Sequence, residues 1–263
     1  MLLENTPIEE HCLNGIKVLV KREDLFGQYP APPLAKLRGA RIILKQMAEQ
    51  GVKEVGVFDT RISKAGQGIA YLCKEFGIHA ICGFPKINGI AMEETHRIAA
   101  EVLGAELYPL KAGRTAILYA RFKKYITEER NVPILPLGLT FPETAYAVEC
   151  ISRAETEGIA TIVLSTGTGT IATGVALGTS AHVFGVSCGM NIGRQQNRIN
   201  KIVGDRLLMN LTLVPPEYAY YDKLDTSSCP FPTSPYYDMK AWVWLSKNIH
   251  NLPQPLMFWN IGV

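Results

Sequence analysis

Short apolar runs alternate with amphipathic stretches along residues 51–110. The apolar runs have the length and composition of buried strands, and the stretches between them carry apolar residues at helical spacing. The predicted strands are 52–58, 78–84 and 105–110, and the predicted helices are 68–76 and 89–104. Parallel strands need crossover connections of this kind, so the pattern predicts a series of βαβ units.

A second series of the same kind follows after residue 141. It predicts helices over 142–157 and 170–178, and strands over 160–164 and 181–186. Residues 204–237 are rich in proline and tyrosine and are predicted to be irregular, whereas a helix over 238–248 and a strand over 255–259 close the chain. The chain is therefore predicted to be an α/β protein.

Composition and charge narrow the class of protein. The 263 residues are 47% hydrophobic and 19% charged, which is ordinary for a globular protein. A net charge of +3, without any run of lysine and arginine, gives weak support to nucleic-acid binding. The N-terminus MLLENTPIEEH lacks the pattern of a signal peptide, and no segment is apolar for long enough to span a bilayer.

Cysteine and histidine positions give no sign of a metal site. The six cysteines are scattered and never form C-x-x-C, and the five histidines lack the spacing of metal ligands. Reduced thiols are therefore expected, as in a cytoplasmic protein.

The segment LSTGTGTIATG, residues 164–174, follows a predicted strand and opens a predicted helix. Small residues let the backbone turn tightly, so that successive N–H groups and the helix N-terminus face one anion. It is neither a P-loop nor a G-x-G-x-x-G fingerprint. Two interpretations remain open, a phosphate-binding loop and a turn that serves only helix–strand packing.

Lys36 lies between a proline-rich segment and a predicted helix start. A solvated surface lysine is the ordinary interpretation. If the amine were desolvated near a helix N-terminus, its pKa would fall and it would become a nucleophile. A nucleophilic lysine and a phosphate-binding loop are the minimum requirement for a pyridoxal phosphate (PLP) Schiff base.

The stretch VKREDLFGQYPAPPLAKLRG, residues 20–39, resembles the N-terminal region of fold-type II (tryptophan synthase β-like) PLP enzymes. It is most similar to the aminocyclopropane-carboxylate (ACC) deaminase and D-cysteine desulfhydrase family. This resemblance implies that Lys36 holds the cofactor and that the run from Ser165 to Thr170 binds its phosphate. The implied phosphate-binding residues are Thr166, Gly167, Thr168, Gly169 and Thr170.

The C-terminal segments SPYYDMKAW and PLMFWNIGV are similar to two further segments of that family. By this match Tyr237 stands for an active-site tyrosine, and Asp238 for the residue that faces the pyridine nitrogen. Other roles remain open, because Asp238 precedes a predicted helix and would also serve as its N-cap, and Tyr237 would also fit a core position.

The sequence departs from the family at several positions. After the second strand the family has a serine, which contacts the substrate carboxylate, and an asparagine, which contacts the cofactor's phenolic oxygen. Ser63 is kept, and the resemblance implies that it has this catalytic role, but Lys64 replaces the asparagine. Lys64 could donate to the cofactor's phenolic oxygen or to a substrate carboxylate, or it could face solvent. Prolines replace the glycine before Lys36, and the final glycine pair is reduced to IGV. The run RQQNR, 194–198, is predicted to be a solvated helix face, with the binding of an anionic substrate as the alternative.

The resemblance implies two open twisted α/β domains, a large cofactor-binding domain of residues 1–37 and 141–263 and a small domain of residues 38–140. It implies carbanion chemistry at the α-carbon of an amino acid or a similar amine, of the deaminase or lyase type, in a homodimer. One alternative is the processing of an amino acid attached to a modified DNA base, such as decarboxylation, as compact phage relatives perform. Another is a binding protein that has lost catalysis.

Overall fold

The computed structural model describes residues 5–27, 32, 34–86, 94–111 and 113–262. The chain divides into a large unit, made of Met1–Gln28, Pro33–Gly39 and Phe141–Val263, and a small unit, made of Tyr29–Pro32 and Ala40–Thr140. Among the described residues, no helix is both long enough and apolar enough to cross a membrane.

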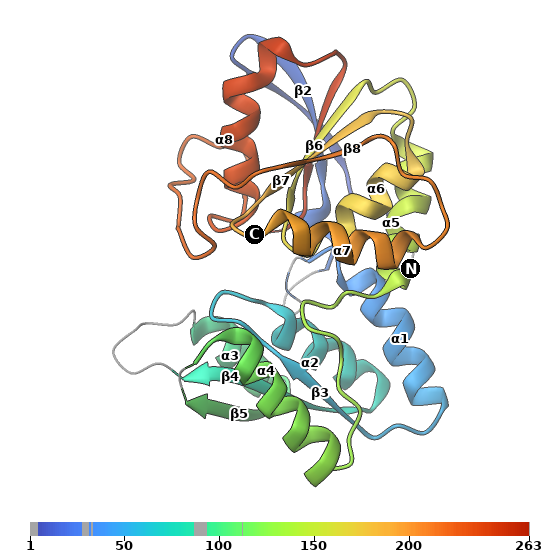
Figure 1. Cartoon of the computed structure of the whole chain (residues 1–263), viewed down its shortest axis with the longest axis vertical. Helices are drawn as coiled ribbons and strands as arrows, with labels where there is room; N and C mark the ends of the chain where they lie inside the picture. The colour runs from blue at the N-terminus through green and yellow to red at the C-terminus, as the bar shows by residue number, and fades with distance from the viewer. Residues whose placement is uncertain (1–4, 28–31, 33, 87–93, 112, 263) are drawn as a thin grey trace. The chain divides into compact units, whose positions relative to one another are not determined.

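The large unit contains a six-stranded sheet in the order β1-β2-β9-β6-β7-β8 (Figure 1). Its strands are β1 (Ile8–Leu13), β2 (Ile16–Arg22), β6 (Thr161–Thr166), β7 (His182–Ser187), β8 (Leu211–Val214) and β9 (Leu256–Asn260). All neighbouring pairs are parallel except β1 and β2. Every residue of β6 and β9 is buried, as expected of strands in a parallel sheet that is covered on both faces.

The antiparallel pair β1–β2 is a hairpin that the apolar pattern does not predict. Leu13 pairs with Ile16, so the loop consists only of Asn14 and Gly15. Both loop residues have positive φ, of 51° and 80°, which a tight two-residue hairpin turn requires. The Asn-Gly dipeptide is therefore the local signal that would have revealed this hairpin.

Helices cover both faces of the large sheet. They are α5 (Pro142–Glu155), α6 (Thr170–Gly178), α7 (Ile192–Val203) and α8 (Asp238–Asn248). Figure 1 shows α8 on one side of the sheet and α5 and α6 on the other. The starts of α6 and α8 agree with the sequence prediction. Their first residues, Thr170 and Asp238, are both predicted site residues.

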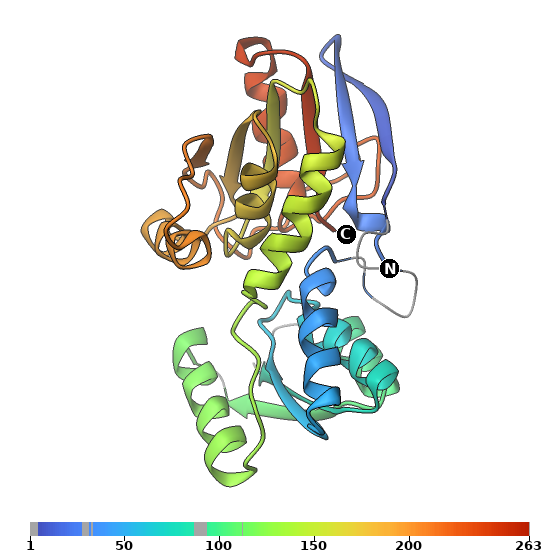
Figure 2. The same ribbon diagram turned by 90° about the vertical axis from the view of Figure 1, so that its right-hand side faces the viewer.

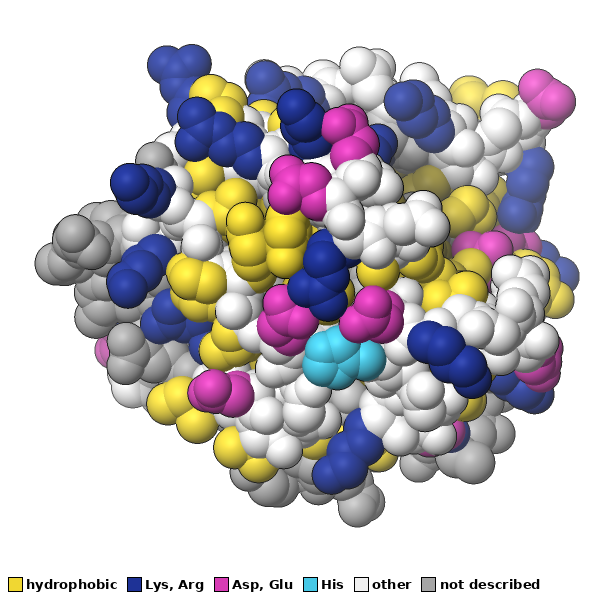
Figure 3. Space-filling model, turned by 90° about the horizontal axis from the view of Figure 1, so that it is seen from below, with side chains coloured by type: hydrophobic (Ala, Val, Ile, Leu, Met, Phe, Trp, Pro, Cys, Tyr) yellow, Lys and Arg dark blue, Asp and Glu magenta, His cyan; other side chains and the backbone are white. Residues whose placement is uncertain are grey.

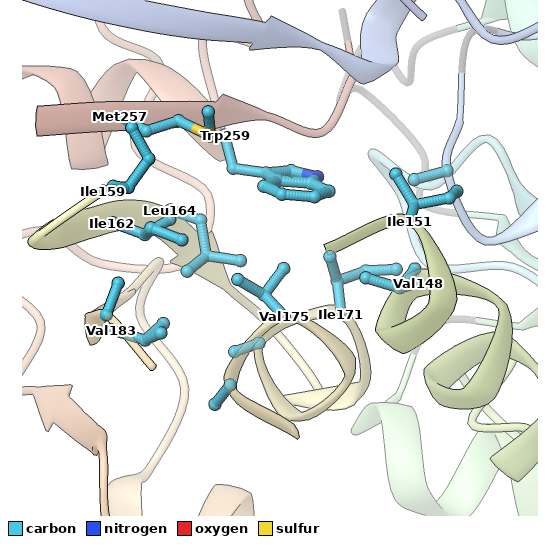
Figure 4. Packing of buried hydrophobic residues seen from close by; sticks show 14 residues of the cluster. Val148, Ile151, Ile159, Ile162, Leu164, Ile171, Val175, Val183, Met257 and Trp259 are labelled. Atoms are coloured by element: carbon cyan, nitrogen blue, oxygen red, sulfur yellow. The ribbon is translucent and has the colours of Figure 1, made fainter. Parts of the chain in front are cut away.

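The core between the sheet and helices α5 and α6 is formed by aliphatic side chains around one tryptophan (Figure 4). Leu164 of β6 and Trp259 of β9 are paired in register and are both fully buried. Val148 of α5 and Val175 of α6 pack into the same cluster. Burial of each such side chain contributes about 1.5–3 kcal/mol to folding. This core fixes the carboxyl end of β6, from which the glycine-rich loop begins.

Helix α1 (Leu37–Glu49) starts immediately after Lys36, and Gly39 lets its first turn lie against α5. A Cβ on Gly39 would lie 2.4 Å from the backbone nitrogen of Thr144. We expect Gly39→Ala to lower the free energy of unfolding by about 1–3 kcal/mol, even though alanine is the better helix former. Chemical denaturation measures this change.

Gly193→Ala is the matched control, because Gly193 is also helical and a Cβ there would approach only the side-chain oxygen Oδ1 of Asn191, at 3.3 Å. That substitution should leave stability unchanged or slightly increase it. Equal stabilities for the Gly39 and Gly193 variants would contradict the close approach of α1 and α5.

The small unit contains a parallel three-stranded sheet in the order β3-β4-β5. Its elements are β3 (Glu54–Phe58), α2 (Ala65–Phe76), β4 (His79–Lys86), α3 (Glu94–Val102), β5 (Glu106–Lys111), α4 (Thr115–Lys124) and a π-helical segment, Tyr125–Glu129. Helix α4 covers one face of the sheet, and α2 and α3 cover the other (Figure 2). The βαβ series predicted from the sequence is confirmed for this unit.

Charged side chains of both signs are mixed on the surface of the small unit. Arg130 bonds to Glu106 at 3.1 Å and to Glu54 at 3.4 Å, and His79 lies 3.8 Å from Glu106. Figure 3 shows basic and acidic side chains interspersed on one face of the molecule. Mixed charges of this kind do not create the one-sided positive field that attracts nucleic acid.

Most predicted bounds lie within two residues of the observed ones, whereas the helix predicted over 68–76 and the segment 204–237 differ further. Helix α2 begins at Ala65, three residues earlier than predicted, and Ser63 Oγ accepts a hydrogen bond from the N–H of Ala65, one of the donors that have no partner within the helix. The segment 204–237 is not wholly irregular, since it contains β8, which adds to the sheet edge beside β7. The first part of the predicted helix 89–104 lies outside the described residues, and its remainder forms α3.

Candidate active site

Lys36 lies in a short turn that pairs with the C-terminal segment. Leu34 forms an isolated antiparallel bridge with Gly262, and the Ala35 N–H donates to the carbonyl oxygen of Ile261 at 3.4 Å. Ala35 is fully buried, whereas Lys36 is partly buried. The C-terminal segment therefore holds the lysine at the start of α1.

Ile261 also contacts the second predicted cofactor residue. Its backbone N–H donates to Oδ1 of Asp238 at 3.2 Å, while its carbonyl oxygen accepts from Ala35. The Lys36 turn and the Asp238 carboxyl are thus connected through a single residue. The two positions are 202 residues apart in the sequence, so only the fold brings them together.

Asp238 is a buried carboxyl at the carboxyl edge of the large sheet. Its side chain is 1% exposed, and Ser165 Oγ, at the end of β6, donates to its Oδ1 at 2.8 Å. Burial raises the pKa of Asp238 to about 7, against the opposing effect of the hydrogen bonds from Ser165 and Ile261. Such a carboxyl can share a proton with a basic nitrogen placed beside it near neutral pH.

The segment from Thr166 to Thr170 forms the strand–loop–helix turn predicted from the sequence. Gly169 has φ of +88° and caps α6, and a Cβ there would lie 2.7 Å from Ile199 Cγ1. Around Gly167, by contrast, a Cβ would meet only Cys188 Sγ, at 3.8 Å. The hydroxyls of Thr168 and Thr170 lie 3.0 Å apart. The loop therefore offers hydroxyl donors and an accessible backbone at the N-terminus of α6, where an anion is favoured.

Two buried side chains support this loop from behind. Gln195 Nε2 donates to the carbonyl oxygens of Thr166 and Gly167, both at 3.0 Å. Cys188 Sγ donates to the Thr166 carbonyl at 3.1 Å, and burial raises the pKa of this thiol to about 12, so it stays protonated. Gln195 is fully buried, so the prediction that 194–198 is a solvated helix face is wrong at this position.

Burial lowers the pKa of Lys36 to about 8, with Cys188 opposing the shift and Arg198 adding to it. Cys188 follows β7 and also supports the loop, whereas Arg198 lies on α7, so the charge state of Lys36 responds to both elements. A substantial share of the Lys36 amine is neutral at mildly alkaline pH, and only the neutral amine is a nucleophile. The interpretation as a purely solvated surface lysine does not hold.

The KRED sequence, residues 21–24, forms a buried ionic network. The sequence pattern indicated only a family resemblance here and not this network. Glu23 binds Arg38 in bidentate geometry, with both N–O distances 2.9 Å, and both side chains are fully buried. Arg22 binds Asp24 in the same way, at 2.9 and 2.8 Å. Arg38 is two residues after Lys36, so the Glu23 pair anchors the turn that carries the lysine.

We expect Glu23→Gln to lower the free energy of unfolding by about 3–5 kcal/mol, because the substitution removes the buried carboxylate that pairs with the Arg38 guanidinium. Chemical denaturation of the apoprotein measures the change. Glu10→Gln serves as the control, since Glu10 pairs with Lys17 on the surface and such pairs contribute about 0–1 kcal/mol. A Glu23 variant as stable as the Glu10 variant would rule out an anchoring role.

Tyr237 is partly buried at the residue before α8. Its hydroxyl lies 2.8 Å from that of Tyr220, and the two rings meet edge to face. The contact orients the phenol, but it does not by itself assign the residue to catalysis. The predicted catalytic role of Tyr237 stays a prediction.

Ser63 and Lys64 belong to the small unit, at the turn between β3 and α2. Ser63 Oγ accepts a hydrogen bond from the Ala65 N–H, and Lys64 is the residue immediately before the helix. Sequence analysis overlooked Asp59 at the end of β3. Asp59 Oδ2 accepts from the Gly66 N–H at 2.8 Å, and burial raises the pKa of Asp59 to about 7. The predicted roles of Ser63 and Lys64 toward a ligand stay predictions.

No family model matches the chain. A protein of Pseudomonas phage M6, named glycyl-dTMP PLP-dependent decarboxylase, is 36% identical over 280 residues that cover 100% of both chains.

Solved structures share the fold at low sequence identity. An ACC deaminase homologue superposes with a TM-score of 0.81, at 17% identity, over 100% of this chain and 90% of its own. A PLP-dependent aspartate racemase gives a TM-score of 0.71, at 13% identity, over 98% and 89% of the two chains. Diaminopropionate ammonia lyase of Escherichia coli gives 0.69, at 13% identity, over 98% and 82%.

These findings confirm the resemblance found in the sequence. The full-length relative is a PLP-dependent enzyme, and the structural neighbours are fold-type II PLP enzymes. The chain belongs to the family of the phage glycyl-dTMP decarboxylase and is a PLP-dependent enzyme of fold type II.

Proposed function

We propose that this enzyme removes the carboxylate from an amino acid that is attached to the base of a pyrimidine nucleotide, with glycyl-dTMP as the model substrate. The observation that carries the proposal is the 36% identity to the phage decarboxylase along the whole of both chains. Fold-type II PLP enzymes share chemistry at the α-carbon of an amino acid. The phage relative therefore supports the choice of substrate and of the bond that is broken.

The residues of the large unit fit PLP. Lys36, whose pKa is lowered to about 8, would hold the cofactor through its amine, and the loop from Thr166 to Thr170 would bind the phosphate. Asp238, buried and bonded to Ser165, would face the pyridine nitrogen. When bound, PLP supplies an electron sink for the pair of electrons left on the α-carbon after a bond to it breaks.

Each residue then has a definite task in decarboxylation. Asp238, as a carboxylate, would keep the facing pyridine nitrogen protonated and so strengthen the electron sink. Loss of CO₂ leaves an electron pair on the substrate's α-carbon, and Lys36 Nζ would deliver the proton that replaces the carboxylate there. The Ser165 hydroxyl would keep the Asp238 carboxyl in its orientation through the 2.8 Å hydrogen bond.

Roles for the remaining predicted residues form part of the same proposal. Ser63 would donate to the substrate carboxylate, and Lys64 to the cofactor's phenolic oxygen or to that carboxylate. Tyr237 would assist as an acid or by stacking on the ring, since its hydroxyl is oriented by Tyr220. The homodimer that the family resemblance implies would be tested by the mass of the protein in solution.

The test is an assay of the purified protein with PLP and glycyl-dTMP. Release of CO₂, together with a nucleotide product that has lost its carboxylate but kept its amine, is the expected result. Free amino acids, including ACC and D-cysteine, are assayed in parallel because the fold is shared with an ACC deaminase homologue. Release of ammonia from a free amino acid, without CO₂ from glycyl-dTMP, would instead support the deaminase function. A visible cofactor band without any turnover would support a binding protein.

A further inference from the structure

Helix α7 carries a row of basic residues beside the glycine-rich loop. Arg194, Arg198 and Lys201 are spaced by four and three residues, so they lie on one side of the helix, and α7 contains no acidic residue. The helix therefore has no ion pairs within itself, and its positive charge can interact with an anion outside the helix.

Contacts on both sides of Arg198 fix α7 against the loop. Gln195 donates to the loop carbonyls of Thr166 and Gly167. Ile199 packs where a Cβ on Gly169 would lie, only 2.7 Å from Ile199 Cγ1. Arg198 is therefore carried by a part of the helix that cannot move away from the loop without breaking these contacts.

One nitrogen of Arg198 is buried without a partner. Nη1 has almost no solvent access and no hydrogen-bond partner among the residues that the structure describes. Other buried guanidinium groups of the large unit are paired, Arg38 with Glu23 and Arg22 with Asp24. Burial lowers the pKa of Arg198, and Arg194 adds to the shift, which is the electrostatic cost of a guanidinium without a counter-charge. An anionic ligand would remove that cost.

We propose that Arg198 is a phosphate-binding residue of the active site, which takes a phosphate monoester beside the loop from Thr166 to Thr170. The planar guanidinium matches a phosphate in bidentate geometry, and its buried nitrogen is the free donor. The contacts of Gln195 and Ile199 with the loop place this part of α7 beside the N-terminus of α6, and the pKa of Lys36 is lowered in part by the charge of Arg198.

Two phosphates have this chemistry. One is the phosphate of PLP and the other is the 5′-phosphate of the nucleotide, and the second source rests on the proposed function. In either case Arg198 extends the loop, which on its own offers backbone N–H groups and threonine hydroxyls but no positive charge.

The experiment compares phosphate-bearing ligands with their phosphate-free counterparts. Apoprotein is titrated with PLP and with pyridoxal, followed by visible absorption, and the PLP-loaded enzyme is titrated with dTMP and with thymidine, followed by calorimetry. The variants are Arg198→Gln and Arg198→Lys. Arg194→Gln is the matched control, because it removes the same charge from an exposed position one turn earlier on α7.

We expect Arg198→Gln to weaken one phosphate-bearing ligand by about tenfold to a hundredfold, the range typical of a hydrogen bond to a charged group. Its phosphate-free counterpart should bind as to the wild type. Arg198→Lys should restore part of the loss and covers the case in which the glutamine variant does not fold. Weakened PLP with unchanged pyridoxal assigns Arg198 to the cofactor, and unchanged PLP with weakened dTMP assigns it to the substrate.

Overturning the proposal requires that the Arg198 variants bind all four ligands as Arg194→Gln does. A wild-type enzyme that does not bind dTMP counts against the proposed substrate and leaves the PLP arm to decide the role of Arg198. If PLP binding is then also insensitive to Arg198, both ideas fail.

Discussion

Lys36→Ala is expected to abolish both turnover and the visible absorption band of the protein-bound cofactor. The amine is the attachment point proposed for PLP, and its pKa of about 8 makes it reactive near neutral pH. Loss of a covalent catalytic group reduces kcat by at least about a thousandfold. The spectrum of protein reconstituted with PLP, recorded beside the activity, separates loss of attachment from loss of later proton transfer.

Two other lysines define the controls for that result. Lys45 is exposed on α1, the helix that begins directly after Lys36. Lys45→Ala should therefore leave both the absorption spectrum and the activity unchanged. Lys240 is buried beside Cys188, but its Nζ donates to three backbone carbonyls, those of Cys188, Ala219 and Tyr220. An ammonium held in this way is a structural charge and not a nucleophile. If the absorption band survives in Lys36→Ala and disappears in a Lys240 variant, Lys240 and not Lys36 is the lysine that binds the cofactor.

Asp238→Asn is expected to reduce kcat by about a hundredfold to a thousandfold, with a smaller effect on the affinity for PLP. An amide cannot hold the pyridine nitrogen in its protonated form, so the electron sink weakens while the phosphate loop remains. Ser165→Ala removes only the 2.8 Å hydrogen bond to the carboxyl and should reduce kcat less. Kinetics and PLP titration of the wild type, Ser165→Ala and Asp238→Asn measure these effects, and kcat should fall in that order. Equal kcat in wild type and Asp238→Asn would exclude the carboxyl from catalysis.

The pH dependence of apoprotein stability gives a second, independent test of the raised pKa of Asp238. Because burial raises the pKa of Asp238 to about 7, the folded state binds more protons than the unfolded state between pH ~4 and ~7. Stability should therefore fall as the pH rises through this window, by at most about 4 kcal/mol for this group. Asp238→Asn should make the slope shallower, and Asp59, whose pKa is also raised to about 7, should account for part of what remains. Denaturation at the two ends of the window measures the slope.

Local patterns were sufficient where a feature depends on neighbours in the sequence. The helix 170–178 and the start of α8 at Asp238 agree with prediction, because apolar spacing and small residues act within one turn or one strand. The strand–loop–helix turn and the lysine at a helix start were likewise visible. By contrast, β8 was missed because four residues in a proline-rich segment carry too little pattern.

Charged networks could not be predicted in the same way. Glu23 and Arg38 have the composition of surface residues, and only the fold buries both and sets their bidentate contact. Likewise, the polar run that contains Gln195 and Arg198 has the pattern of a solvated helix. The burial of Gln195 within this run depends on its contacts with the loop from Thr166 to Thr170, which no property of α7 itself reveals.

The sequence alone was enough to predict the α/β class. Through its resemblance to fold-type II enzymes it also indicated PLP and offered a lysine, a loop and a carboxyl as candidates, because each of these features lies within a short segment. Only the tertiary structure decided that Ile261 connects the Lys36 turn with Asp238, and that Ser165 orients the carboxyl. It also decided that Lys36 is desolvated and that Arg198 has a buried donor. The physical reason is that pKa values and unsatisfied donors depend on burial and on partners from distant parts of the chain, which a linear pattern does not contain.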